Sequence, residues 1–166
     1  MDKRLKFSLA RLWLYRAKDE LTAAENSMKE KHYNAVINQV YPAMLFAFHA
    51  LLAAKGIDVQ KSWDIIRAAY KQHSETLDIP KFYLDNFLFA ITERHLIYYE
   101  ECYLVSESNA ERAINYAKSL LDGISSRLET HIRHAVETHR QFINLDMKRK
   151  IETDKAVLPY FPPNGE

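Results

Sequence analysis

Arg94 and the two tyrosines that follow it are the residues of this sequence whose types and spacing best suit chemistry. The stretch ERHLIYYEE places Arg94 ahead of Tyr98 and Tyr99 in a segment that is otherwise rich in apolar residues. A guanidinium can hold a phosphate with two parallel hydrogen bonds, and a tyrosine adds a hydroxyl or a ring face. Because neighbouring residues point about 100° apart around a helix, at most one of the two tyrosines should share a cleft with Arg94. The pattern predicts a helical protein with one polar site.

Motifs for metal binding and for nucleophilic catalysis are missing from the sequence. A di-iron site in a helical bundle needs Glu-x-x-His on two helices, and this spacing occurs nowhere in the chain. His131 and His134, followed by Glu137 and His139, are more typical of a solvated helix face than of a zinc site. The lone Cys102 can build neither a zinc site nor a disulfide framework. We therefore expect no metal, no cofactor and a reducing, cytoplasmic location.

The composition is that of one domain made of long helices. The chain has 166 residues, 48% of them hydrophobic, with only three glycines and five prolines, which leaves little material for tight turns. Its formal charge of +1 provides no global field for nucleic acid or for an anionic membrane. No apolar run approaches the roughly 20 residues that a membrane span needs. The basic and apolar start of the chain is interrupted by Arg11, so an amphipathic helix is expected there instead of a signal peptide.

Apolar residues that recur every three or four positions predict four or five helices. In the second helix, Pro42 should cause a kink, and Gly56 should end the helix in the left-handed conformation. Ser108 and Glu111 have the spacing of a capping box at the start of the last helix. The helices are expected at 8–31, 33–55, 63–73, 80–102 and from 108 onward.

Helical periodicity resumes at Leu128 and continues to Ile143, which predicts a long helical extension at the carboxyl end. The expected fold is all-α, an up-and-down bundle of four or five helices. A single domain should cover residues 1–150, and a proline-containing tail should cover residues 151–166.

Between residues 10 and 125 the sequence resembles a HEPN domain (higher eukaryotes and prokaryotes nucleotide-binding) in its small, single-domain form. The resemblance implies an HEPN-like bundle, and it depends on weak, mostly apolar letters spread over several helices. The residues that carry it are Ala17, Leu21 and Ala24, then Ala35, Tyr41, Ala43, Met44, Leu51, Leu52 and Gly56, then Arg94 with Tyr98 or Tyr99, and Ser108 to Leu121.

The sequence departs from the family pattern at the residues that cleave RNA. Where the second helix often carries arginine this chain has Gln39, and Pro42 replaces a frequent tyrosine. Members that cut RNA have an arginine followed, after four to six residues, by a histidine. Counted from Arg94, these positions hold Tyr99 and two glutamates, and tyrosine is a poor general base because its pKa is about 10. The same spacing recurs at three other pairs, which chance accounts for: Arg67 and His73, Arg127 and His134, and Arg133 and His139.

The resemblance implies a homodimer in which the arginine-bearing helices form a shared polar cleft for a nucleotide or an RNA phosphate. It also implies a nucleotidyltransferase partner in a toxin–antitoxin-type system, and no membrane partner. The residues expected to line the cleft are Arg94, Tyr98, Tyr99, Gln39 and Tyr41.

Two alternatives to this binding module stay open. One is an RNA-cleaving toxin, in which Arg94 stabilises the charged transition state and a histidine brought close by folding acts as the base. The other is a structural helical scaffold that uses its carboxyl-terminal tail, with Leu158, Tyr160 and Phe161, as a docking peptide.

Overall fold

The computed structural model describes residues 3–76 and 79–157, and within these ranges the secondary structure is helical with no strand. The prediction of an all-α fold is therefore confirmed. The chain divides into two compact units, Met1–Leu128 and Glu129–Glu166. The helices of the described ranges are α1 (Lys3–Lys29), α2 (Tyr33–Lys55), α3 (Ser62–Thr76), α4 (Lys81–Tyr99) and α5 (Glu107–Val157).

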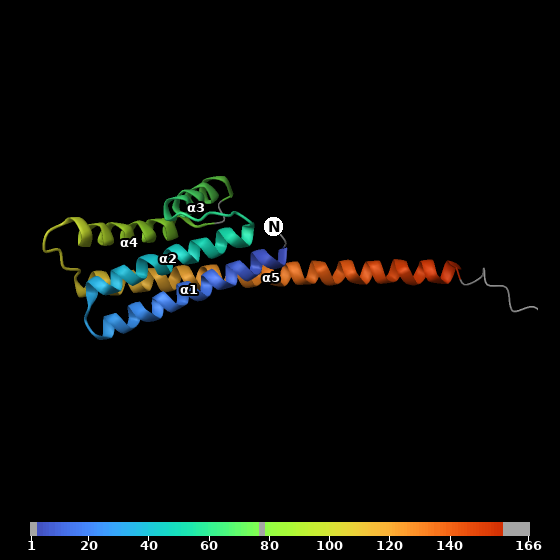
Figure 1. Cartoon of the computed structure of the whole chain (residues 1–166), viewed down its shortest axis with the longest axis horizontal. Helices are drawn as coiled ribbons and strands as arrows, with labels where there is room; N and C mark the ends of the chain where they lie inside the picture. The colour runs from blue at the N-terminus through green and yellow to red at the C-terminus, as the bar shows by residue number, and fades with distance from the viewer. Residues whose placement is uncertain (1–2, 77–78, 158–166) are drawn as a thin grey trace, which may run out of the picture. The chain divides into compact units, whose positions relative to one another are not determined.

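Helix α2 is the central helix of the first unit, packed against α1, α3 and α4 (Figure 1). By length and composition alone it could cross a membrane, so the expectation that no apolar run is long enough is wrong. Two thirds of its apolar window, 67%, is buried inside the bundle, as for the core helix of a globular protein. The fully buried side chains that it contributes include Val36, Ile37, Val40, Met44, Phe48, Leu51 and Leu52.

Small residues allow α1 to approach α2 closely. Ala10, Ala17 and Ala24 repeat every seven positions and are completely buried. Leu5 and Leu12 belong to the same helical period, but each is 51% exposed and lies away from this core. The outer side of α1 therefore carries apolar side chains that the first unit does not bury.

The end of α2 follows the prediction. Gly56 has a φ of 77° in the left-handed region. Its N–H donates to the carbonyl of Ala53, and the N–H of Ile57 donates to the carbonyl of Leu52. These bonds satisfy carbonyls that the helix end leaves unpaired. Pro42 lies inside α2 without ending it.

The start of α5 corrects the predicted cap. The helix begins at Glu107, and the Oγ of Ser106 accepts a hydrogen bond from the N–H of Asn109 at 3.1 Å. The carbonyl of Ser106 also accepts the N–H of Ala110. Ser106 is thus the N-cap, and the capping box at Ser108 is wrong by two residues, because Ser108 already lies inside the helix.

The first part of α5 packs against α4. The Phe89 and Tyr116 rings meet edge to face, and the Tyr83 hydroxyl lies directly over Gly123. A Cβ at position 123 would come within 2.7 Å of the Tyr83 ring carbon Cζ, so glycine here makes room for a buried tyrosine.

The single helix α5 continues to Val157, past residue 150, where the tail was predicted to begin. The first helix breaker of that region is Pro159, which explains the later end. The proposed docking residues Leu158, Tyr160 and Phe161 lie outside the described residues.

Candidate functional site

The Arg94 guanidinium lies against two tyrosine rings. Its Cζ is 4.5 Å from the ring centroid of Tyr41 on α2 and 5.0 Å from that of Tyr98 on α4. The Tyr41 ring also stacks on the fully buried Phe87, with ring centroids 5.6 Å apart. Tyr98 is 60% exposed and lies on the solvent side of this contact. The core thus fixes one ring, while the other ring remains accessible from solvent.

The described part of the chain provides no hydrogen bond and no carboxylate partner for Arg94, which is half-buried. A guanidinium stacks through its flat faces, and its five N–H donors lie in its plane. Contacts with the Tyr41 and Tyr98 rings therefore hold the group without using its donors. An arginine in this state is suited to bind an anion.

Glu93, the nearest acid in sequence, is committed to a separate buried network. Its carboxylate accepts the Tyr103 hydroxyl at 2.8 Å and the Asn109 side-chain amide at 3.0 Å. Burial, and then the hydrogen bond to Glu93, raises the pKa of Tyr103. Asn34 of α2 adds two hydrogen bonds to the same loop. Its side-chain amide donates to the Tyr103 carbonyl, and its side-chain oxygen accepts the N–H of Val105. The network ties the α4–α5 loop to α2 and keeps the Glu93 charge away from Arg94.

Sequence reasoning missed this network. A signal for it was present, because Glu93 interrupts the apolar run FLFAIT–HLIYY of α4 just as Arg94 does. An acid at such a position needs buried donors. Those donors come from the loop and from α5, which no local pattern places beside α4.

Two of the predicted cleft residues have other contacts. Gln39 accepts a hydrogen bond from the Ser27 hydroxyl of α1 at 2.8 Å, which directs its side chain toward α1. The Tyr99 ring lies 4.5 Å from the ring of His95, also on α4. The structure therefore brings together Arg94, Tyr41 and Tyr98, and it places Gln39 and Tyr99 in separate contacts.

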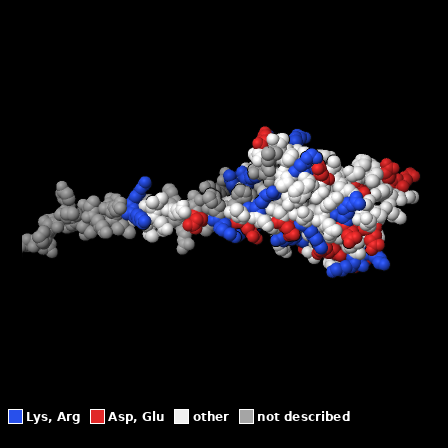
Figure 2. All heavy atoms as spheres, turned by 180° about the vertical axis from the view of Figure 1, so that it is seen from behind, with Lys and Arg blue, Asp and Glu red and all other residues white. Residues whose placement is uncertain are grey.

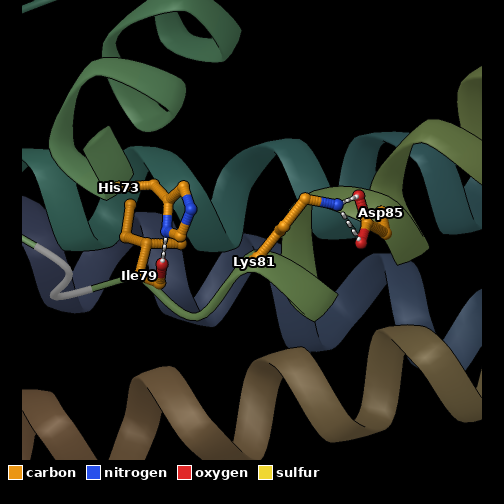
Figure 3. A network of polar contacts seen from close by, with 4 residues as sticks. All are labelled: His73, Ile79, Lys81 and Asp85. Carbon is orange, nitrogen blue, oxygen red and sulfur yellow. Dashed lines mark hydrogen bonds and ion pairs between the residues drawn. The ribbon is translucent and has the colours of Figure 1, made fainter.

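The pair Arg67 and His73 on α3 does not form a catalytic arrangement. The Arg67 side chain is 81% exposed and lies 3.9 Å from Asp64. The Nδ1–H of His73 donates to the carbonyl of Ile79 at 2.6 Å and so fastens the link from α3 to α4, where Lys81 also pairs with Asp85 (Figure 3). The side chains of His134 and His139 lie outside those described.

A second aromatic and polar cluster joins α1 to α2. The His49 ring stacks on Trp13 with centroids 4.0 Å apart, and His49 is almost completely buried. Burial lowers the pKa of His49, while the Asp58 carboxylate and a hydrogen bond with the Val59 backbone act in the opposite direction. This histidine is a neutral packing residue and lies in a different cluster from Arg94.

A pocket of about 440 Å³ opens between the α1–α2 turn and the α4–α5 loop. Asn34 is one of the residues that line this pocket, and none of the predicted cleft residues lines it. The residues that line the pocket are Lys31, His32, Tyr33, Asn34, Ala35, Leu104 and Val105.

Among the described residues no group of histidines, cysteines and acids could hold a metal ion.

Comparison with known proteins shows which family this chain is similar to. The family model of the HEPN domain matches residues 10–127. A UPF0332 protein of Thermotoga maritima is 27% identical over 128 residues, which cover 75% of this chain and 94% of that protein.

Among solved structures, the crystal structure of an archaeal HEPN homologue superposes with a TM-score of 0.58 at 18% identity. It covers 72% of this chain and 97% of that chain, and at this identity it supports the fold alone. With the family match extending over most of its length, the chain belongs to the HEPN domain family.

Proposed function

We propose that the protein is a dimeric HEPN-type binding module that holds a phosphate of a nucleotide or of RNA at Arg94 and does not cut RNA. The observation that carries the proposal is the Arg94 guanidinium, which lies against the Tyr41 and Tyr98 rings and has no hydrogen-bond or ion-pair partner among the described residues. A phosphate accepts two parallel hydrogen bonds from such a group. The exposed Tyr98 ring offers a base a surface for stacking.

The missing histidine argues against the RNA-cleaving alternative. Cleavage needs a base within hydrogen-bond reach of the reacting hydroxyl, and the contacts of Arg94 are tyrosine rings. The adjacent His95 lies against Tyr99. The geometry supports binding better than turnover.

The proposal includes a partner and a compartment. The resemblance to HEPN modules supports a small nucleotidyltransferase as partner, in a toxin–antitoxin-type pair, and a cytoplasmic location. Positive and negative side chains are interspersed on the face shown in Figure 2. This mixture fits recognition of a ligand by one local site instead of by a field of a single sign.

Calorimetric titration with AMP tests the site. We expect the wild-type protein to bind AMP and Arg94→Ala to bind it about tenfold to a hundredfold more weakly, since hydrogen bonds to a charged group contribute roughly 1.5–3 kcal/mol. Arg94→Lys keeps the charge but loses the two parallel bonds, so it should recover only part of the affinity.

Arg112→Ala is the matched control. Arg112 is also an arginine over an aromatic ring, 5.5 Å from the centroid of Phe89, and it is exposed on α5. Its loss should leave AMP binding unchanged. Equal affinities for wild type and Arg94→Ala would contradict the proposal, and RNA cleavage that disappears in Arg94→Ala would favour the toxin instead.

A further inference from the structure

The first half of α1 concentrates positive charge that the net charge of the chain conceals. From residue 3 to residue 18 the sequence contains basic residues and no acidic one, although the whole chain carries only +1. The charge therefore belongs to one segment of one helix. The basic residues are Lys3, Arg4, Lys6, Arg11, Arg16 and Lys18.

Helical geometry gathers three exposed side chains on the outer face of this segment. Ala10 and Ala17 mark the side of α1 that faces the core. Arg11, Tyr15 and Lys18 follow the i, i+4, i+7 spacing on a side about 100–140° around the helix from Ala10 and Ala17, and all three are exposed. Tyr15 is 69% exposed. With about 1.5 Å of rise per residue, the two cations lie roughly 10 Å apart along the axis with the tyrosine between them.

Arg16 belongs to a different side of α1, about 140° from Arg11 and about 160° from Lys18 around the helix. Its Cζ lies 5.1 Å from the Trp13 ring centroid and 5.9 Å from that of Phe46. In the part of the chain that the structure describes, no carboxylate pairs with Arg11, Arg16 or Lys18.

The outer side of α3 also combines exposed aromatic and basic residues, but its basic side chains have carboxylate partners. There Arg67 lies 3.9 Å from Asp64, and Lys71 lies 3.8 Å from Glu75. The positive charge of α3 is locally balanced, whereas that of α1 is not.

We propose that the face of Arg11, Tyr15 and Lys18 binds a single-stranded nucleic acid. The cations contact successive phosphates, and a base stacks on the exposed Tyr15 ring. Proteins that bind single strands without sequence preference combine positive charge along the backbone with aromatic platforms. A membrane fits less well, because only Leu5 and Leu12 add apolar area here and each is about half buried.

This face is independent of the Arg94 site. Arg11, Tyr15 and Lys18 are exposed on α1, whereas Arg94 of α4 contacts Tyr41 of α2 and Tyr98 of α4. A variant of one site should therefore leave the other intact.

Fluorescence anisotropy with labelled oligouridylate and with oligodeoxythymidylate, over a range of salt concentrations, tests the proposal on the full chain. The slope of log affinity against log salt should become shallower by about 1.4 in the double variant Arg11→Ala, Lys18→Ala, at roughly 0.7 per lost phosphate contact. Tyr15→Ala should weaken binding about fivefold to a hundredfold, the range measured for one stacked base, and Tyr15→Phe should not.

Helix α3 supplies matched controls of the same residue types. Trp63→Ala and the double variant Arg67→Ala, Lys71→Ala should leave the affinity and the salt slope unchanged. Circular dichroism confirms that each variant is folded.

Three outcomes would overturn the proposal: no binding of either oligonucleotide, loss of binding in the α3 variants only, or capture of phosphatidylserine vesicles without capture of oligonucleotides. The Arg94 test uses AMP, which is too small to span Arg11 and Lys18, so the two proposals succeed or fail separately.

Discussion

Glu93 and Arg94 are adjacent in sequence and occupy opposite environments. About 100° of helix rotation separates them, so Glu93 reaches the donors of Tyr103 and Asn109 while Arg94 reaches the ring of Tyr41. A buried carboxylate is tolerated where donors surround it. A guanidinium is tolerated against aromatic faces. Because neither charge neutralises the other, the arginine keeps its capacity for an external anion.

His49 makes the stability of the fold depend on pH. Burial lowers its pKa in the folded protein, whereas an unfolded chain takes up the proton near pH 6.5. Below that pH the unfolded state binds more protons than the folded state, so the free energy of unfolding falls. The contribution of neutral His49 is complete above pH 6.5 and is lost as the pH falls toward its lower folded pKa.

Urea unfolding at pH 7.5 and at pH 5.5 measures this effect. We expect the wild-type protein to lose stability on acidification, and His49→Gln to lose distinctly less, because its side chain does not titrate. His95→Gln, at an exposed position of α4, should behave as the wild type. An unchanged pH dependence in His49→Gln would show that other groups produce it.

At the scale of single elements, the start of α5 depends on one hydroxyl. Ser106 caps the N–H of Asn109, and loss of such a cap typically costs about 1 kcal/mol. Ser106→Ala should therefore lower the free energy of unfolding by about 1 kcal/mol, read from urea denaturation. Ser108→Ala is the control at the position that the sequence favoured, and it should have little effect. The reverse ranking would restore Ser108 as the cap.

The elements show what periodicity can and cannot predict. The apolar pattern located every helix, and Gly56 marked the end of α2 correctly, because left-handed backbone strongly favours glycine. The cap of α5 was misplaced because two serines and two glutamates stand close together there, and only the backbone decides among them. The pattern also could not select Tyr98 over Tyr99 as the partner of Arg94, since that choice depends on where α2 places Tyr41.

At the scale of the whole molecule, the exposed side of α4 mixes polar residues such as Lys81, Asp85 and His95 with large apolar ones. Tyr83, Leu84 and Phe87 are buried on one side. Leu88 is 51% exposed, and Tyr98 is more exposed still. A surface helix normally shows a charged face opposite its apolar stripe. Exposed apolar residues of this size are typical of an interface, which fits the proposed dimer.

Sedimentation equilibrium tests this assembly. We expect the wild-type protein to sediment at twice the 19.5 kDa mass of the chain. Leu88→Glu should shift the protein toward the monomer, because a carboxylate buried in the interface must give up its hydration without a partner. Leu12→Glu is the matched control, since Leu12 has the same 51% exposure on α1, and it should leave the dimer intact.

A monomeric wild type would remove the shared cleft, while AMP binding at Arg94 could persist in a single subunit. Dissociation by Leu12→Glu alone would move the interface to α1.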